Sequence, residues 1–472
     1  MRHFIRLLLG VVFLTGCAHY PVNAPETHYD PAQGYRFSKN ASGDNTNSLF
    51  LCLTFSGGGT RAAALSYGVL QKLRDVTITW KGTRKRLLDE VDCISSVSGG
   101  SFTAAYYGLF GERLFQDFRS RFLERNVQGE LEGLAFNPVN WPRLASPDFS
   151  RSDLAAELYG ETIFDGRTFA DLSQSRQRPF VIINATNLAS GERFGFTQEQ
   201  FDFLGSDLRS YPVARAVAAS SAFPILLSPI SLYNYPSPAD YAVPQTVTNG
   251  LKDYDSNRRR YQWALNRAAY LDKQNHPYVH LMDGGLADNI GLRAVENEYR
   301  NGFINELIND GQIEKLVVIV VNARTEDQDV ISRKESPPKL ETVAYKTSTI
   351  ALDNYSFETI EMMKDLQKER LQAQQAVADC QQKLDRCPAK PQLPKFPVVI
   401  DPYVIEINFE AIPDKTCRDR FLQLPTNFRL SQEQVQALID ISSQLLDRSP
   451  RFKELLASMG YPLQEKPFRC PL

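Results

Sequence analysis

A serine surrounded by very small residues is the first sign of chemistry in this chain. Ser98 lies in CISSVSGGSF, residues 93–102, where an apolar run gives way to a helix-like segment. A strand, a sharp turn and a helix start form the nucleophile elbow of serine hydrolases. Ser96 and Gly100 are small enough for that turn, although the usual G-x-S-x-G pattern has glycine at the position of Ser96. We therefore predict that Ser98 is a nucleophile, activated in part by the helix dipole; a flexible linker is the alternative.

A run of three glycines provides a second candidate feature. The stretch SGGGTR, residues 56–61, follows a strand-like run and contains Gly57, Gly58 and Gly59. Such a run lets backbone N–H groups converge on one anion, as in an oxyanion hole. The stretch lacks the Lys-Ser/Thr pair of a phosphate-binding P-loop and the third glycine of a dinucleotide-binding loop. Arg61 would either hold this loop in place or face the oxyanion directly.

Asp283 is the candidate general base. It ends the strand-like run YVHLMD and precedes Gly284-Gly285, so its carboxylate would be exposed at a tight turn. A serine hydrolase commonly uses histidine instead, but this chain has only His3, His19, His28, His276 and His280. The first three precede the expected core, His276 lies in a loop-like stretch, and strand alternation turns His280 away from Asp283. The sequence thus indicates a Ser-Asp dyad, in which an apolar setting would raise the Asp283 pKa.

Two strand–glycine turn–helix units position these residues. The first begins with the strand-like run at 48–55 and the second with VDCISS, ahead of Ser98. This repeated order indicates an α/β fold with a parallel sheet. Further strands are expected at 179–187, 278–283, 315–323 and 402–410.

Two segments interrupt this plan. Residues 231–277 are rich in tyrosine, proline and charge, and a lid that touches lipid through Tyr233, Tyr235 and Tyr241 is one interpretation. Residues 336–397 form a second insertion, in which 356–387 predicts a polar helix with an apolar seam at 3-4 spacing. That seam suggests one arm of a helical hairpin or a cover over a neighbouring surface. Residues 398–472 would supply the last core strand and the C-terminal helices.

The N-terminus predicts export. Residues 1–16 contain two arginines, a short apolar run and small residues, which is typical of a secretory signal peptide. The apolar run is too short to span a membrane. LTGC resembles the lipobox of bacterial lipoproteins, which implies lipid attachment at Cys17 and, because Ala18 follows, an outer-membrane location. Residues 17–47 are rich in Pro, Asn, Ser and Gly and are expected to form a tether.

An exported protein can form disulfides from its remaining six cysteines. Cys380 with Cys387 is one candidate pair, which requires the predicted helix to end between them. Cys417 with Cys470 is another. Cys52 and Cys93 lie in strand-like runs and are expected to be buried thiols.

The three motifs, in this order, resemble those of the patatin-like phospholipase family: GGGTR, SVSGG and DGG. The stretches ATNLASGE (185–192) and AASSAFPILLSP (218–229) also resemble that family, and LPTNFRLSQEQVQALIDISSQLL resembles its closing helix. The resemblance covers about 48–330 and 398–446 and implies a three-layer α/β/α fold with a mainly parallel sheet, here with a helical insertion and a core at 48–335. It also implies that Ser98 is the nucleophile, Asp283 the base, and Gly57, Gly58, Gly59 and Arg61 the oxyanion loop, with no metal or cofactor.

The sequence therefore predicts a membrane-anchored lipid acyl hydrolase whose substrate is a membrane lipid. The formal net charge of −2 and the lack of a polybasic stretch argue against a nucleic-acid partner. Two alternatives remain at this stage. The chain could transfer an acyl group to an acceptor alcohol, or it could be a non-catalytic surface module for a protein partner that the sequence does not identify.

Overall fold

The computed structural model describes residues 19, 22–37, 45–175, 178–224, 226–325, 335–387, 402–461, 463 and 466–472. Its centre is an eight-stranded sheet in the order β12-β11-β2-β5-β6-β10-β9, with β7 paired to β6. The strands are β2 (Leu49–Phe55), β5 (Val91–Val97), β6 (Phe180–Asn187), β7 (Arg193–Gly195), β9 (Ile230–Tyr233), β10 (Tyr278–Asp283), β11 (Lys315–Asn322) and β12 (Tyr403–Asn408). From β12 to β6 the strands are parallel, whereas β10 is antiparallel to β6.

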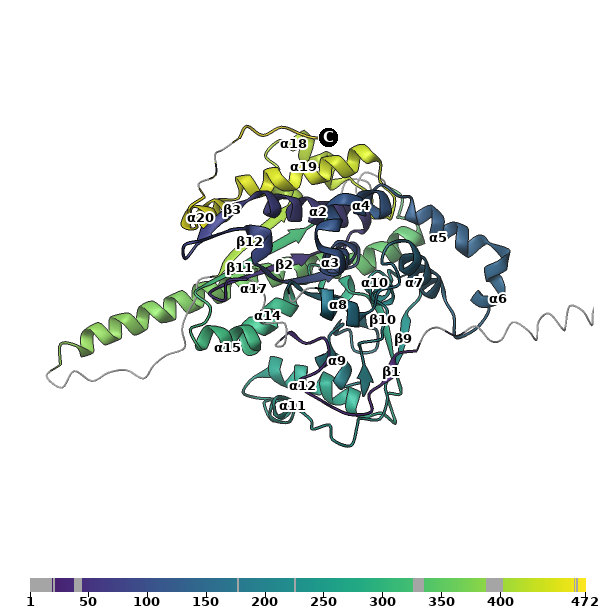
Figure 1. Ribbon diagram of the computed structural model, residues 1–472, viewed down its shortest axis with the longest axis horizontal. Helices are drawn as coiled ribbons and strands as arrows, with labels where there is room; N and C mark the ends of the chain where they lie inside the picture. Colours follow the sequence, from purple (N-terminus) through teal and green to yellow (C-terminus); the bar gives the residue numbers. More distant parts are fainter. Residues whose placement is uncertain are drawn as a thin grey trace, which may run out of the picture.

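Helices cover both faces of this sheet, so the prediction of a three-layer α/β/α fold with a mainly parallel sheet is confirmed (Figure 1). One layer contains α2 (Gly59–Asp75), which packs on α19 (Gln432–Arg448), the predicted closing helix. The central strands β2, β5 and β6 are buried along their whole length, which explains their continuous apolar character. The other helices are α3 (Gly99–Phe110), α4 (Leu114–Phe118), α5 (Val127–Phe136), α6 (Trp141–Leu144), α7 (Arg151–Thr162), α8 (Phe169–Ser175), α9 (Gln198–Asp202), α10 (Val213–Ser220), α11 (Gln245–Gly250), α12 (Arg258–Leu271), α13 (Gly285–Asp288), α14 (Leu292–Asn301), α15 (Phe303–Asn309), α17 (Leu340–Leu384), α18 (Lys415–Leu422) and α20 (Pro450–Ser458).

Residues 22–37 pack against the core, so the prediction that 17–47 is a tether is wrong for this part. The ring of Tyr35 is buried and stacks on Phe180 with 4.3 Å between ring centroids. Its hydroxyl donates to the Val181 carbonyl and accepts from the Val181 amide. Phe37 also packs on Phe50 and Phe180, and the buried Arg36 guanidinium pairs with Asp202, so aromatic and ionic contacts together hold this segment. The predicted signal peptide and Cys17 lie outside the described residues.

The three tyrosines singled out in the 231–277 insertion, Tyr233, Tyr235 and Tyr241, also pack on other parts of the protein. Tyr233 stacks on Tyr235, whose hydroxyl donates to the carbonyl of Asn23. Tyr241 makes an edge contact with Tyr29. These contacts join the insertion, which includes α11 and α12, to the N-terminal segment, and they do not favour a lipid-facing lid.

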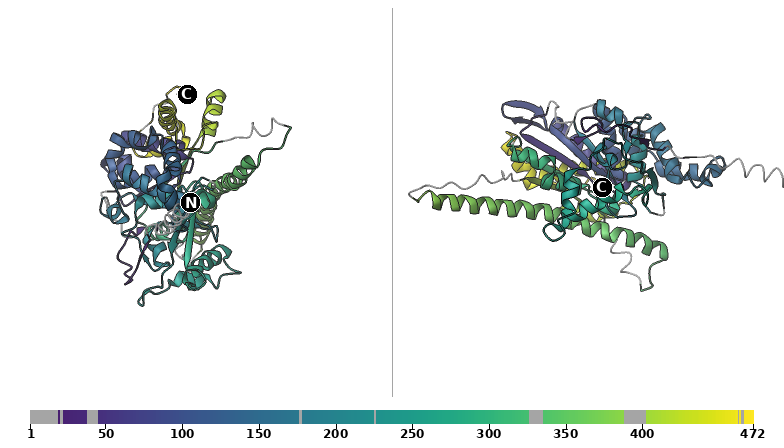
Figure 2. Two further views of the ribbon diagram at one scale, coloured as in Figure 1. Left: turned by 90° about the vertical axis from the view of Figure 1, so that its right-hand side faces the viewer. Right: turned by 90° about the horizontal axis from the view of Figure 1, so that it is seen from below.

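Helix α17 begins earlier than predicted and is uninterrupted from Leu340 to Leu384. Its first half covers α13 and α14, and Met363 of the predicted seam is buried. Its second half leaves the body of the protein (Figures 1 and 2), where Ala373 and Cys380 of the seam are exposed. The expectation of a cover is therefore met only by the first half. The return arm of a hairpin would fall in residues 388–401, outside the described residues.

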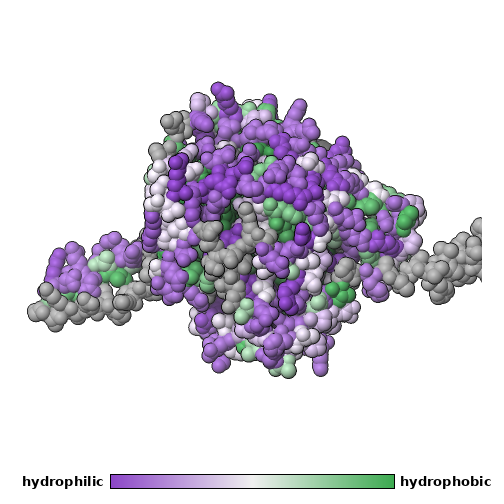
Figure 3. All heavy atoms as spheres, viewed as in Figure 1, coloured by the Kyte–Doolittle hydropathy of each residue, from purple (hydrophilic) through white to green (hydrophobic). Residues whose placement is uncertain are grey.

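Helices α5 and α6 form a projection at the opposite end of the molecule from the free half of α17 (Figure 1). A short 3-10 helix, Pro138–Asn140, connects them. Figure 3 shows apolar residues gathered over this projection, on a face that is otherwise largely polar.

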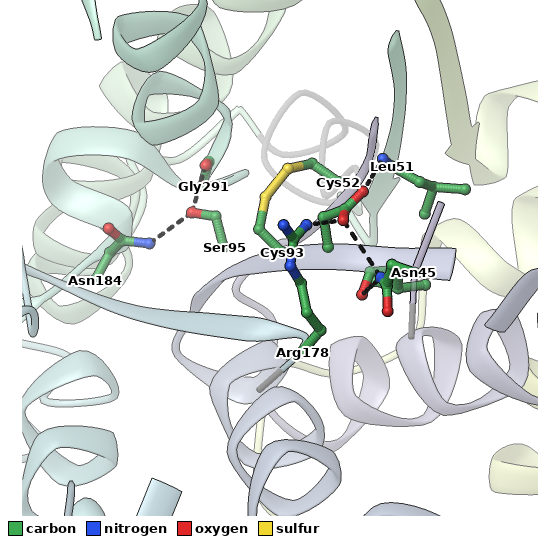
Figure 4. The surroundings of a disulfide bond; sticks show 10 residues. Asn45, Leu51, Cys52, Cys93, Ser95, Arg178, Asn184 and Gly291 are labelled. Atoms are coloured by element: carbon green, nitrogen blue, oxygen red, sulfur yellow. Dashed lines mark hydrogen bonds and ion pairs between the residues drawn. A yellow bond between two sulfur atoms is a disulfide. The ribbon is translucent and has the colours of Figure 1, made fainter. Parts of the chain in front are cut away.

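Two disulfides join cysteines of the described residues, and one of them corrects the sequence-based interpretation. Cys417 is bonded to Cys470, one of the two predicted pairs, whereas Cys380 and Cys387 are free and exposed because α17 continues past Cys380. Cys52 and Cys93, expected to be thiols, are bonded to each other (Figure 4). They face each other on the adjacent parallel strands β2 and β5, with Cα atoms 4.6 Å apart. The sequence does not state which strands are neighbours, so this pairing was missed.

Candidate active site

Ser98 occupies the sharp turn between β5 and α3. Its backbone has φ 49° and ψ −120°, in the region that L-residues other than glycine rarely adopt. The turn is also very tight, because a Cβ added to Gly99 would lie 2.0 Å from the Gly59 carbonyl oxygen. A Cβ on Gly100 would lie 2.7 Å from Phe55. The local geometry is that of a nucleophile elbow.

Hydrogen bonds between serines hold this turn and explain why serine can replace glycine at position 96. The Ser96 hydroxyl donates to the Ile182 carbonyl of the neighbouring strand at 3.1 Å and accepts from Ser101. The Ser98 amide donates to the Ser220 hydroxyl at 2.9 Å, and Ser220 donates to the Asn184 carbonyl at 2.6 Å. These partners link the elbow to β6 and α10. The roles of Ser220 and Ser101 were not predicted, because they depend on how the helices pack.

Sheet register brings Asp283 next to Ser98. Val97, the last residue of β5, is paired with Asn184 of β6, and Asp283 of β10 is paired with the next β6 residue, Ala185. The Ser98 side chain lies close enough to the Asp283 carboxyl to lower its pKa, and the Gly285 amide donates a hydrogen bond to this carboxylate at 2.8 Å. The predicted nucleophile and base thus lie side by side at the same end of the sheet and line one cavity.

The Asp283 carboxyl has a strongly shifted pKa. Its side chain is buried, and burial raises the pKa to about 7, while the hydrogen bonds from Gly285 and Ser98 partly oppose the rise. Desolvation penalises the charged form. Near neutral pH this carboxylate therefore has a proton affinity suited to general base catalysis.

The glycine loop lies beside Ser98. A Cβ on Gly57 would approach the Ser98 Cβ to 3.3 Å. The Gly57 amide donates to the Asn289 carbonyl, whereas no hydrogen bond to another described residue engages the amides of Gly58 and Gly59. Both residues have positive φ, 135° and 60°, as glycine allows. Two of the three predicted amides thus have no hydrogen-bond partner among the described residues, whereas the Gly57 amide is already engaged.

Arg61 holds the loop. Its guanidinium is buried and donates to the carbonyls of Ala323 and Leu424 and to the Thr426 hydroxyl, at 2.8–2.9 Å. These bonds tie the start of α2 to segments that follow β11 and α18. Of the two roles considered for Arg61, its contacts favour the structural one.

A cavity of about 830 Å³ opens above these residues. Ser98, Asp283 and the glycine loop form part of its wall. Apolar side chains supply much of the rest: Leu131, Ala135, Phe136, Leu154, Phe223, Pro224, Leu226, Leu227, Leu352 and Phe428. These residues come from α5, α7, α17 and connecting segments, and none lies in 231–277. The sequence did not identify them, because apolar side chains have no distinguishing pattern when they line a cavity instead of the core.

Histidine side chains lie away from the described part of this site. The described residues that line the cavity include no histidine, and His280 instead contacts the Ser231 hydroxyl at 2.8 Å on the surface. Within the described ranges, no cluster of three or more His, Cys, Asp or Glu side chains is arranged to hold a metal ion. A search of the described helices found none that is long and apolar enough to cross a bilayer.

Comparisons with known proteins were made on the sequence and on the structure. A family model described as patatin-like phospholipase matches residues 53–295. Among solved structures, human GIVD cytosolic phospholipase A2 is similar at 14% identity with a TM-score of 0.37. The alignment covers 63% of this chain and 49% of that chain, about half its length. The same human enzyme in complex with methyl gamma-linolenyl fluorophosphonate and terbium chloride aligns at 14% identity with a TM-score of 0.33, over 64% of this chain and 44% of that one. No curated protein sequence shows significant similarity.

Proposed function

This chain belongs to the patatin-like phospholipase family, and we propose that it is a lipid acyl hydrolase with a Ser98–Asp283 dyad. One observation carries the proposal. The serine at the strained elbow lies beside a buried carboxyl of raised pKa and the glycine loop, at the wall of a largely apolar cavity.

In the first half of the reaction, the Ser98 oxygen attacks the ester carbonyl while Asp283 accepts its proton. The amides of Gly58 and Gly59 bind the oxyanion of the tetrahedral intermediate. The intermediate collapses, the bond to the alcohol breaks, and the alcohol leaves with the proton from Asp283. In the second half, water attacks the acyl-Ser98 ester, its proton passes to Asp283 and then to Ser98, and the fatty acid is released.

The apolar cavity suits the acyl chain of the substrate. Its volume lies within the range typical of small-molecule sites, roughly 300–1,000 Å³. We propose phospholipids, lysophospholipids or related esters as substrates, with the protein held on the outer membrane by a lipid on Cys17. Attachment of enzyme and substrate to one membrane would raise their effective concentration.

The proposal is tested with Ser98→Ala and Asp283→Asn, assayed on phospholipids, lysophospholipids and p-nitrophenyl esters. Because the dyad residues act as a unit, we expect either change to lower the rate by about 10³-fold or more. A fluorophosphonate probe should label the wild type and not Ser98→Ala. Ser190→Ala, in an exposed turn, is the matched control and should retain full activity. A folded wild type that neither labels nor cleaves any of these esters would refute the proposal.

A further inference from the structure

The α5–α6 projection exposes an unusual concentration of apolar side chains. Phe136, Val139 and Trp141 are 76%, 77% and 57% exposed, and they fall within six consecutive residues. Leu226, 53% exposed, belongs to a separate segment but lines the same cavity as Phe136. We call these four residues the mouth surface. Exposed apolar patches of this kind mark interaction sites.

Capped helices hold the mouth surface outward. Asn126 caps α5 by accepting from the Gly129 amide, and Asn137 caps the next turn by accepting from the Val139 amide. The buried side chain of Asn140 donates to the Leu134 carbonyl at 2.9 Å and fixes the angle between the turns. Because backbone hydrogen bonds are satisfied locally, Val139 and Trp141 are presented on a defined scaffold.

We propose that the mouth surface docks on a lipid bilayer and inserts Val139 and Trp141 into its interface. Phe136 and Leu226 are at once exposed and part of the cavity wall, so a lipid leaving the bilayer at this surface would reach Ser98 without crossing water. Tryptophan is favoured at membrane interfaces because its ring is apolar and its N–H is polar.

The net charge of this segment favours binding by insertion of apolar side chains over electrostatic attraction to the membrane. Residues 127–151 contain three acidic side chains (Glu130, Glu132 and Asp148) and two basic ones (Arg143 and Arg151), a net charge of −1. Such a segment has no affinity for anionic lipids through charge alone. The apolar side chains must therefore supply the binding, and salt should weaken it little.

The position of the N-terminus supports the same orientation. The His19 Nδ1 atom lies 3.3 Å from the carboxylate of Asp148, four residues after α6 ends. The proposed anchor precedes His19 in the chain, and His19 lies against the segment that carries the mouth surface. The docking proposal thus rests on the proposed lipid substrate and agrees with the proposed anchor.

Tryptophan fluorescence provides a direct test, since the chain has only Trp80, Trp141 and Trp263. The test uses the full-length acylated protein on phosphatidylcholine vesicles. In a variant that retains only Trp141 (Trp80→Phe, Trp263→Phe), brominated acyl chains should quench the tryptophan fluorescence. The variant that retains only Trp263, on α12, should not be quenched. Absence of Trp141 quenching overturns the proposal, and so does equal quenching of both. A blue shift without quenching, together with a concentration-dependent dimer, would assign the surface to a second copy instead.

A kinetic test uses residues outside the cavity wall. The double variant Val139→Ser, Trp141→Ser should hydrolyse vesicle phospholipid about tenfold more slowly or worse, because it lacks the two apolar side chains that would insert into the bilayer. Hydrolysis of a soluble short-chain ester should be unchanged. The control, Tyr254→Ser with Leu265→Ser, removes exposed apolar residues from the α11–α12 region and should alter neither rate. If the Val139→Ser, Trp141→Ser variant hydrolyses vesicle phospholipid as fast as the wild type, docking is refuted. If the wild type is inactive on both substrates, the proposed function is refuted, and the fluorescence test alone then decides whether the surface docks.

Discussion

Ser98 is held in a backbone conformation that costs about 1–3 kcal/mol in an isolated chain. Its surroundings stabilise this conformation. The Ser220 hydroxyl accepts its amide hydrogen, and the backbone of Gly59 packs against Gly99 with no room for a side chain. Gly99 of the turn contacts Gly59 of the glycine loop, so a change in the conformation of the turn would also move that loop.

Gly99→Ala should consequently damage both stability and activity. The added methyl would overlap the Gly59 carbonyl, and we expect the free energy of unfolding to fall by about 3 kcal/mol or more, as in other overpacked sites. Gly133→Ala is the control, because Gly133 lies in α5 with no atom within 4 Å of an added Cβ. This change should stabilise the protein by about 0.5–1 kcal/mol. Urea unfolding measures both, and equal effects of the two changes would contradict the argument.

The raised pKa of Asp283 predicts opposite effects of pH on activity and stability. Below pH 7 the carboxyl is protonated and cannot accept the Ser98 proton, so kcat/KM should rise with pH through about 7. The folded-state pKa exceeds the unfolded value of about 3.9, so the stabilising contribution of the protonated form is complete below pH 4 and is lost as pH rises through 7.

Asp283→Asn should therefore be inactive yet more stable than the wild type at pH 8, by up to about 4 kcal/mol. The difference should vanish below about pH 3, where the wild-type carboxyl is neutral in both states. Chemical denaturation across this pH range checks the prediction. A wild type as stable as the variant at pH 8 would show that burial does not raise the pKa of this carboxyl.

At the scale of elements, an ion pair between Asp153 and Arg215 joins α7 to α10. The two side chains are 5% and 2% exposed, and Asp153 also closes the capping box of α7 with Ser150. Both helices matter to the site, since α7 supplies Leu154 to the cavity and α10 supplies Ser220 to the elbow.

Arg215→Met should destabilise the protein by about 3–5 kcal/mol, because it leaves the Asp153 carboxylate buried without its cation. The matched change Lys364→Met removes an exposed partner of Glu361 on α17 and should cost less than about 1 kcal/mol. Thermal unfolding of the two variants separates these expectations. A small effect of Arg215→Met would mean that other groups compensate the charge of Asp153.

At the scale of the whole molecule, the predicted lipid anchor and the catalytic body are separable. Cys17→Ser should prevent acylation and reduce membrane association, because lipid attachment adds about 0.8 kcal/mol per buried methylene. Hydrolysis of a soluble ester should be unaffected, since residues 22–37 pack against the core independently of Cys17. Mass spectrometry of the N-terminal peptide and membrane fractionation test this prediction. Detection of an unmodified Cys17 in the wild type would remove the anchor from the proposal.

The sequence alone determined the order of elements and the identity of the two central side chains. Strand-length apolar runs followed by glycine turns predicted β2, β5 and the helices after them, because these patterns depend only on local periodicity and backbone sterics. The motifs around Ser98 and Asp283 were visible for the same reason, since tight turns require small residues at fixed positions.

Tertiary structure alone decided which distant segments meet. The Cys52–Cys93 bond depends on β2 and β5 being neighbours, and the contact between Ser98 and Asp283 depends on β10 pairing antiparallel with β6. The packing of Tyr35 on Phe180 and the apolar wall of the cavity likewise arise from contacts between residues far apart in the chain. A hydrophobic side chain has the same local pattern whether it fills a core, lines a cavity or faces a membrane, so only its surroundings in space distinguish these roles.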